Sequence, residues 1–174
     1  MTHFKNHIYS IMMNRKGVVM SNYSKLFDKK LIFLNVAASE RNDLYQQVSD
    51  KLEKLGFVHD SFSQALIKRE DEFPTGVITQ YLPIALPHAN PENVKKPFIA
   101  VVQTKDNIHV QQMGTNDAEK TRNFFFLGIV KETQDLQVKL LQRFMQLMND
   151  QGFVIDFKKI STAKDMYDYL INNF

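Results

Sequence analysis

The stretch FPTGVITQYLPIALPHA, residues 73–89, decides how the rest of the chain is organised. All five prolines of the protein fall between positions 74 and 97. Proline fixes φ, removes a backbone donor and pushes the residue before it towards an extended conformation. The apolar run at residues 84–86 lies between two of these prolines and is typical of a short buried strand. The stretch therefore predicts a stiff, non-helical segment that carries one imidazole, His88, to the rim of a sheet.

Three further apolar runs predict strands on either side of this segment. They cover residues 31–37, 98–103 and 124–130. The last run is almost wholly apolar, as expected for a central strand that is covered on both faces. Ile108 and Val110 indicate a weaker strand, which we expect to pair with residues 98–103 in an antiparallel hairpin. Residues 116–123 then form a polar loop.

The stretches between the predicted strands carry apolar residues at helical spacing. Helices are predicted up to about residue 55, over residues 61–73 and 134–149, and at the end of the chain. Their candidate N-caps, whose side-chain oxygens can accept an orphan backbone N–H, are Ser39, Asp60, Thr133 and Ser161. Gly56 and Gly152 are expected to end the first and third helices. Residues 154–155 are expected to form a short bridge.

Strands that alternate with helices predict a layered α/β fold. The expected architecture is a single domain with a mixed, parallel and antiparallel, central sheet of about five strands flanked by helices. A length of 174 residues fits one domain, and 44% hydrophobic and 24% charged residues are ordinary for a soluble globular protein. The absence of cysteine excludes a disulfide framework, a thiolate zinc site and a cysteine nucleophile.

Residues 1–19 show neither helical nor strand periodicity. Two interpretations are open: a disordered tail, which is common at chain termini, or translation that starts at Met20. The second follows from residues 15–20, whose codons can be purine-rich and can contain a ribosome-binding sequence just upstream of an ATG. In either case the expected domain covers residues 20–174.

Composition and motifs argue against several classes of function. A net charge of +3 with no block of five like charges disfavours nucleic-acid binding. No apolar run reaches about 18 residues, so direct membrane insertion is not expected. The dispersed glycines form neither GxGxxG nor GxxxxGK(S/T), and HExxH and GxSxG do not occur. The five histidines show no regular metal-ligand spacing, so a metal centre would need histidines from distant positions.

His88 and Arg69 are the candidate reactive residues. A lone histidine after a strand is more often structural, but three features favour chemistry here. His88 follows a predicted strand, where ligands bind in open α/β sheets, and the flanking prolines fix its position. Arg69 lies on the same helical face as Leu66 and Phe73, and a buried guanidinium needs a partner. Either its stem packs while its head reaches solvent, or it points at an anion near the proline-rich segment.

The residues around His88 resemble those of a known family. IALPHA, which follows PTG, is similar to the phosphorylation site of enzyme IIA components of the bacterial phosphoenolpyruvate-dependent sugar phosphotransferase system, in the fructose–mannitol branch. The run VHDSFSQALIKREDEFPTG, residues 58–76, more closely resembles the galactitol-type members, and VVQTKDNIHVQQ and VKLLQRF share that character. The resemblance covers about residues 31–174 and implies a cytoplasmic phosphotransferase.

The resemblance implies a phosphoryl relay that needs no metal, nucleotide or other cofactor. A family member accepts a phosphoryl group from the phosphocarrier protein HPr on a histidine, here His88, and passes it to the IIB component. IIB then phosphorylates sugar that arrives through the membrane component IIC. Neutral imidazole is a suitable nucleophile, and phosphoryl transfer needs mainly positioning and charge stabilisation. Arg69 is the expected partner of the phosphoryl dianion, with Thr75 and backbone N–H groups as further donors.

One position departs from the family pattern. Fructose- and mannitol-type members carry a second histidine at the start of the helix after the central strand, in a His-Leu/Ile pair. Here the matching pair is Asp135-Leu136. Galactitol-type members also lack that histidine, so the change favours their branch. A carboxylate close to His88 would repel the phosphoryl group or orient the free imidazole; alternatively, Asp135 is a helix N-terminal charge that the macrodipole favours.

We therefore expect a galactitol-type enzyme IIA with His88 as phosphoacceptor and with Arg69, Thr75 and Asp135 in supporting positions. Two alternatives keep the same fold. One is a regulatory IIA-like phosphoprotein that signals without transport, and the other is a non-catalytic adaptor that only binds partners. His59 and His109 are expected to be partly exposed and to take no part in the chemistry.

Overall fold

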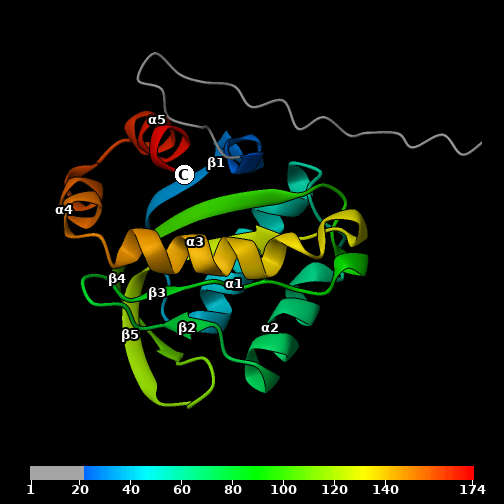
Figure 1. The fold of residues 1–174 in the computed structure, drawn as a ribbon. Coiled ribbons are helices and arrows are strands. Elements are labelled where there is room, and N and C mark those ends of the chain that lie inside the picture. Colours follow the sequence, from blue (N-terminus) through cyan, green and yellow to red (C-terminus); the bar gives the residue numbers. More distant parts are fainter. Residues whose placement is uncertain (1–21) are drawn as a thin grey trace, which may run out of the picture.

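The computed structural model describes residues 22–174. The predicted tail at residues 1–19 and the predicted start at Met20 lie outside these residues. Within them, a five-stranded sheet runs through the domain in the order β1-β4-β5-β3-β2. Helices cover both of its faces, so the predicted layered α/β fold with a mixed sheet of five strands is confirmed (Figure 1).

Parallel and antiparallel pairs alternate across this sheet. The strands are β1 (Phe27–Val36), β2 (Gly76–Val77), β3 (Ile84–Ala85), β4 (Phe98–Gln111) and β5 (Ala118–Gly128). β1 and β4 pair in parallel, β4 and β5 antiparallel, β5 and β3 in parallel, and β3 and β2 antiparallel. β5 is therefore the central strand, as its apolar run predicts, and residues 124–128 are buried.

Within residues 22–174, five α-helices form the outer layers. They are α1 (Arg41–Lys54), α2 (Phe62–Glu72), α3 (Leu136–Met148), α4 (Gln151–Lys159) and α5 (Ala163–Asn173). Short 3-10 turns cover Asn22–Leu26, Pro91–Asn93 and Lys131–Thr133. α1 and α2 contribute to an apolar cluster on one face of the sheet, and α3, α4 and α5 contribute to a cluster on the other.

The phenylalanine triplet of β5 divides its side chains between the two layers. Successive side chains of a strand point to opposite faces. Phe124 and Phe126 join the cluster with α1 and α2, where the ring centroids of Phe126 and Tyr45 lie 5.3 Å apart. Phe125 joins the other cluster, with its ring centroid 4.6 Å from that of Phe144 in α3. The triplet therefore ties both helical layers to the central strand.

The predicted hairpin within residues 98–113 is wrong. β4 is one continuous strand of 14 residues, with a register irregularity between Gln103 and Ile108. Its antiparallel partner is β5, which begins at Ala118, so most of the predicted polar loop at residues 116–123 is strand. The outer parts of both strands form a ribbon with one solvated face, and such a ribbon shows alternation rather than a continuous apolar run.

None of the four predicted helix caps occupies the N-cap position of its helix. The predicted caps are Ser39, Asp60, Thr133 and Ser161. At Ser39 the donor direction is reversed, because its backbone N–H and hydroxyl donate to the Asp43 carboxylate at 2.8 and 3.1 Å. α5 is capped by Thr162, whose hydroxyl accepts from the Asp165 N–H at 3.1 Å. α2 and α3 begin without a side-chain cap bond. Several short polar residues stand near each helix start, so the sequence does not select one of them.

Glycine marks one of the two predicted helix ends. Gly56 follows α1 with a φ of 78°, so the predicted positive-φ stop is confirmed. Gly152 lies inside α4, which begins where the Asp150 carboxylate accepts a first-turn N–H at 2.8 Å. The predicted short bridge at residues 154–155 is therefore wrong, because these residues are helical.

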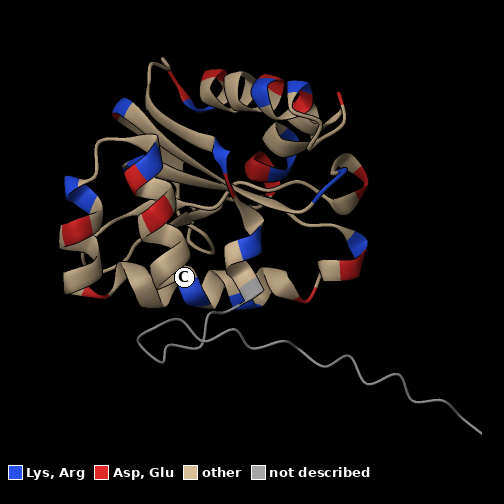
Figure 2. Cartoon of the chain, turned by 90° about the horizontal axis from the view of Figure 1, so that it is seen from above, with Lys and Arg blue, Asp and Glu red and all other residues tan. Residues whose placement is uncertain are grey.

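Charged side chains are mixed over the surface. Figure 2 shows Lys and Arg segments interspersed with Asp and Glu segments along the helices. Lys and Arg balance Asp and Glu in residues 22–174, because the three basic residues in excess, Lys5, Arg15 and Lys16, all precede residue 22. Over the described range 22–174, the structure contains no helix that combines the length and the apolar character needed to cross a membrane.

Candidate active site

The proline-rich segment reaches the sheet through two short strands and a few single hydrogen bonds. The Leu86 N–H donates to the Thr75 carbonyl at 3.1 Å, beside the β2–β3 pair. The Pro87 carbonyl, just before His88, accepts from the Leu127 N–H at 2.9 Å. These bonds place His88 beside the buried end of β5.

Gly76 allows this segment to approach the sheet closely. A Cβ atom at Gly76 would lie 2.4 Å from the Gln111 carbonyl oxygen at the end of β4. The Gly76 carbonyl accepts from the Met113 N–H at 2.7 Å. A side chain here would separate the segment from β4, so the glycine of the PTG motif is required by close backbone contact.

Both ring nitrogens of His88 have partners that define its protonation. Nδ1 lies 2.8 Å from the Leu86 carbonyl oxygen. Nε2 lies 3.1 Å from Arg69 Nη2 and 2.9 Å from Gln137 Nε2. Because a carbonyl only accepts and a guanidinium only donates, Nδ1 carries the proton and Nε2 presents its lone pair.

Burial keeps the His88 imidazole neutral. The residue is 8% exposed, and its burial lowers its pKa below the usual value of 6.5. The hydrogen bond to the Leu86 carbonyl opposes this shift of the pKa, whereas the positive charge of Arg69 adds to it. A neutral imidazole with a directed Nε2 lone pair is a nucleophile at neutral pH.

Arg69 stands in the last turn of α2 and directs its guanidinium at His88. Its Nε is buried and has no hydrogen-bond partner within residues 22–174. No carboxylate of this part of the chain forms an ion pair with it. Of the two interpretations of Arg69, the geometry favours a side chain that faces an anion site, because its positive charge is not neutralised.

Phe73 is exposed, and the expectation that it shares the buried face of Leu66 is wrong. α2 ends at Glu72, and the backbone at Phe73 turns to φ −137° and ψ 81°, so helical periodicity stops there. Phe73 is 60% exposed, and its ring centroid lies 5.5 Å from the guanidinium carbon of Arg69. The ring therefore lies beside the candidate site and adds apolar surface to it.

Thr75 bonds to Glu70 rather than to His88. Its backbone N–H and its hydroxyl donate to the two carboxylate oxygens of Glu70, at 2.8 and 2.7 Å. Thr75 is 2% exposed and Glu70 is 1% exposed. Burial raises the pKa of Glu70, and the hydrogen bonds from Thr75 oppose the rise in pKa. The Thr75 hydroxyl is therefore engaged in anchoring the start of the proline-rich segment to α2.

Sequence reasoning misses Glu70, although a signal is present. Glu70 follows Leu66 by four positions and Phe62 by eight, so it falls on the buried face of α2. A carboxylate on an apolar stripe needs donors, and Thr75 supplies them. Tyr45 is buried in the same region, where burial and the Glu70 charge raise the pKa of its hydroxyl.

Gln137, rather than Asp135, reaches His88. The Asp135 side chain is 74% exposed and lies 4.0 Å from the Lys139 ammonium, one turn along α3. α3 begins at Leu136, later than predicted, and its first turn directs Gln137 at the ring. For Asp135 the geometry favours the interpretation as an exposed charge at a helix start. The sequence offered no charge or periodicity that would mark Gln137.

The side chains that contact the His88 ring are those of Arg69 and Gln137. His59 and His109 are exposed, as expected, and lie outside the set of side chains that contact His88. In the described part of the chain, no group of three His, Cys, Asp or Glu side chains could hold a metal ion. A cavity of about 530 Å³ lies elsewhere and is lined by neither His88 nor Arg69. A reactive ring in this setting suits a reactant that is presented by another macromolecule.

A protein-family model described as "Phosphoenolpyruvate-dependent sugar phosphotransferase system, EIIA 2" matches residues 25–173. The chain belongs to this family. It is an EIIA phosphotransfer domain of the phosphotransferase system, and as such a phosphotransferase that acts through a phosphohistidine. The resemblance seen in the sequence is confirmed at this level.

Relatives of this EIIA domain agree in sequence and in fold. The galactitol-specific EIIA component of Escherichia coli is 30% identical over 103 residues, which cover 59% of this chain and 67% of that protein. The crystal structure of IIA mannitol from Escherichia coli has a TM-score of 0.64 at 20% identity, covering 83% of this chain and 98% of that one. The complex of enzyme IIA mannitol with phosphorylated enzyme IIB mannitol, from the same species, gives a TM-score of 0.66 at 19% identity, with coverage of 85% and 98%. The α/β fold is thus that of mannitol-type IIA structures.

Proposed function

We propose that His88 is the phosphoacceptor of this EIIA domain and that Nε2 is the reacting atom. The observation that carries the proposal is the arrangement around the ring. The Leu86 carbonyl holds the proton on Nδ1, while Arg69 and Gln137 converge on Nε2. A nucleophile and the donors for the group that it receives therefore meet at one point.

The proposed step exchanges one phosphorus–nitrogen bond for another. The Nε2 lone pair of His88 attacks the phosphorus of a phosphohistidine on HPr, and the electron pair of the breaking bond returns to the donor nitrogen. The proton on Nδ1 stays in its hydrogen bond to Leu86. The phosphorylated ring then carries a formal positive charge beside the phosphoryl dianion, which makes it a good leaving group for the second transfer.

Arg69 and Gln137 stabilise the transferred group in this proposal. In the resting site both side chains lie within hydrogen-bond distance of Nε2, at 3.1 and 2.9 Å. When Nε2 bonds to phosphorus, it no longer accepts these hydrogen bonds, and both side chains can donate to phosphoryl oxygens instead. The unpaired Nε of Arg69 is a further donor. Hydrogen bonds to charged groups are worth about 1.5–3 kcal/mol each.

The proposed partners are proteins: HPr as donor and a IIB component as acceptor. Phe73 and Val138 are 60% and 62% exposed beside Arg69 and Gln137, and apolar side chains around a polar centre suit a protein interface. A mannitol-type protein of the same fold is found in complex with phosphorylated IIB, which supports the choice of acceptor. The 30% identity to a galactitol-specific EIIA component supports a role in the uptake of a galactitol-type sugar through IIC. In this role the domain acts in the cytoplasm.

Phosphorylation by phosphoenolpyruvate, enzyme I and HPr tests the proposal, with intact mass read before and after acid treatment. Wild type should gain one acid-labile phosphoryl group, and His88→Ala should gain none. His109→Ala, a matched loss of an exposed imidazole, should be labelled like wild type. A folded wild-type protein that stays unlabelled would favour the adaptor alternative. A label that survives in His88→Ala would place the acceptor on another residue.

A second incubation separates transport from signalling. Labelled protein is mixed with IIB components of the galactitol, mannitol and fructose types. Loss of the label to the galactitol-type IIB alone supports the proposed sugar class. Retention of the label with all three favours the regulatory IIA-like phosphoprotein.

A further inference from the structure

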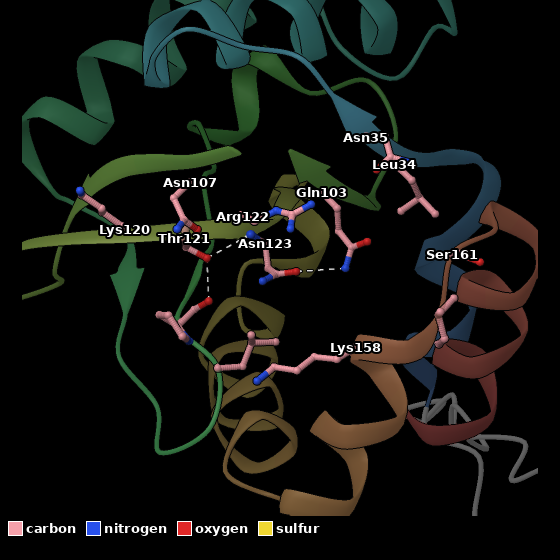
Figure 3. Close-up of a pocket in the computed structure, with 13 residues that line it drawn as sticks. Leu34, Asn35, Gln103, Asn107, Lys120, Thr121, Arg122, Asn123, Lys158 and Ser161 are labelled. Atoms are coloured by element: carbon pink, nitrogen blue, oxygen red, sulfur yellow. Dashed lines mark hydrogen bonds between the residues drawn. The ribbon is translucent and has the colours of Figure 1, made fainter. Parts of the chain in front are cut away.

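A cavity of about 530 Å³ lies away from His88, between the end of β1, the middle of β4 and β5, and the end of α4 (Figure 3). Small-molecule sites commonly have volumes in this range. Asn123 lines the cavity, and it precedes Leu127, the strand neighbour of His88, by four positions. Four residues of strand span roughly 13 Å. The cavity is therefore separate from the site of phosphoryl transfer.

The lining of the cavity is cationic. Its charged residues are Lys120, Arg122 and Lys158, and the described residues around it include no Asp or Glu. Arg122 Nε donates to the Thr104 carbonyl at 2.8 Å, which fixes the guanidinium, and its two Nη groups form no hydrogen bond within residues 22–174. Lys158 Nζ has one long contact, at 3.3 Å from the Tyr81 carbonyl oxygen. A fixed guanidinium with free Nη donors matches two oxygens of a phosphate.

Carboxamide side chains surround these cations. They are Asn35, Gln103, Asn107 and Asn123. Gln103 Nε2 donates to Asn123 Oδ1 at 3.1 Å (Figure 3), which leaves Gln103 Oε1 to accept and Asn123 Nδ2 to donate. A carboxamide both donates and accepts, as an alcohol does, so this lining matches a ligand with several hydroxyl groups. Ser161 adds one more hydroxyl at the edge.

Two strand irregularities shape the same cavity. β1 changes register around Asn35, which adopts a positive φ of 56°. β4 changes register just after Gln103, and Asn107 lies within that irregularity. Bulges redirect side chains and are over-represented next to functional sites. Here both irregularities contribute a carboxamide to one lining.

We propose that this cavity binds a phosphate monoester of a polyhydroxy compound, such as a sugar or polyol phosphate. Arg122 holds the phosphate, Lys158 adds positive charge to the same lining, and the carboxamides of Gln103, Asn107 and Asn123 bind the hydroxyl groups. The site is independent of the function proposed for His88, because none of its residues contacts that ring.

Titration of the full chain with mannitol 1-phosphate, followed by amide NMR, tests this site. Saturable shifts are expected at Gln103, Asn107, Asn123 and Ser161. Inorganic phosphate should bind at least about tenfold more weakly, a difference of about 1.4 kcal/mol, because it lacks the hydroxyl groups. Free mannitol should produce no saturable shifts. Equal affinity for inorganic phosphate, or no saturable binding of mannitol 1-phosphate, would overturn the proposal.

Matched variants locate the binding. Arg122→Gln and Lys158→Gln should each weaken binding of mannitol 1-phosphate at least about tenfold. Lys159→Gln should bind as wild type does, because Lys159 is the next residue of α4 but pairs with Asp156 at 3.0 Å and lies outside the lining. Because Arg122 and Lys158 stand on different elements, either variant tests the site if the other fails to fold. Unchanged binding in a folded variant, or shifts centred on Arg69 and Gln137, would refute it.

Discussion

Arg69 and Glu70 are neighbours in the sequence, yet they serve two polar sites of opposite character. Glu70 turns into the core, where it is 1% exposed and accepts two hydrogen bonds from Thr75 at 2.8 and 2.7 Å. Arg69 turns towards His88 and keeps a buried Nε without a partner in the described chain. Buried polar groups are nearly always satisfied, so an unsatisfied donor in a folded protein calls for a functional explanation. The Glu70 carboxylate finds its donors within the fold, whereas the unpaired Arg69 Nε lies on the side chain that contacts the proposed phosphoacceptor.

The two sites are linked by the course of the chain. Glu70 fixes Thr75, at the start of the proline-rich segment, and His88 stands at its end. A substitution in the satisfied site should therefore lower the free energy of unfolding and leave the intrinsic chemistry in place. A substitution in the unsatisfied site should lower the rate of phosphoryl transfer and leave the free energy of unfolding nearly unchanged.

The largest expected effect is the loss of transfer in Arg69→Ala. Removal of charge-assisted hydrogen bonds to the phosphoryl group, at about 1.5–3 kcal/mol each, should lower the rate of His88 phosphorylation roughly 10²–10⁴-fold. The free energy of unfolding should change little, because Arg69 has no ion-pair partner to leave behind. Rapid-quench measurement with phosphorylated HPr gives the rate, with exposed Lys68→Ala as the matched control. A rate equal to wild type would show that Arg69 has no role in transfer.

The next largest effect concerns stability at Glu70. Glu70→Ala leaves the Thr75 N–H and hydroxyl without acceptors and opens a cavity, and should lower the free energy of unfolding by about 2–4 kcal/mol. Glu70→Gln should lower it by less than about 1 kcal/mol, since the amide can accept from the N–H and donate to the hydroxyl. Urea titration measures both variants. A Glu70→Gln protein that is fully stable but unable to accept phosphate would contradict the division.

The pH dependence of stability sharpens the same comparison. The pKa of Glu70 is raised in the folded state, so the native protein binds more protons than the unfolded chain between the usual value of 4.5 and the raised value. The contribution of Glu70 to stability should therefore fall as pH rises through this interval. Glu70→Gln should flatten this part of the profile. An unchanged profile would mean that another group is responsible.

Gln137→Ala should lower the phosphorylation rate by about tenfold or less. A neutral hydrogen bond contributes about 0.5–1.5 kcal/mol, which is less than the charge-assisted bonds of Arg69. Asp135→Asn is the control from the same helix start, and it should transfer at the wild-type rate because its side chain is 74% exposed. The comparison of initial rates decides which residue supports the site. A larger effect in Asp135→Asn would restore the carboxylate to the mechanism.

The smallest expected effect is a shift of the acid limb of the rate profile. Only neutral His88 is nucleophilic, and its pKa lies below 6.5, so the rate should stay flat around pH 7 and fall only under more acidic conditions. Arg69→Gln removes a positive charge that lowers this pKa, so its acid limb should begin at higher pH. Rates normalised to the plateau of each protein reveal the shift. Coincident normalised profiles would show that the charge of Arg69 does not affect the pKa of His88.

The sheet and the two candidate residues, His88 and Arg69, could be predicted because local patterns mark them. Apolar runs mark the buried strands, including the central one at residues 124–130, and the clustered prolines mark the segment that ends at His88. Arg69 is a charged residue on an apolar helical stripe, which marks it in the sequence. These signals depend on nearest neighbours in sequence, where period and backbone restriction act directly.

The rest could not be predicted because it depends on residues that meet only in three dimensions. Gln137 lies 49 positions from His88 and becomes part of the site through the exact start of α3. The continuity of β4 depends on its pairing with β5, since its polar middle carries no strand signal of its own. Glu70 finds its donors only because the chain turns after α2. In each case tertiary contact, rather than local propensity, decides the outcome.

The Leu86 carbonyl that holds the His88 proton belongs to a group that no amino-acid substitution can delete. Every residue type offers the same oxygen, so replacement of Leu86 preserves the acceptor while the main chain keeps its course. That course is set by Pro83 and Pro87, and by the bond from the Leu127 N–H to the Pro87 carbonyl. The tautomer that is proposed to react is therefore set by the path of the backbone. Substitutions of the side chains around the ring that preserve this path should leave the proton on Nδ1.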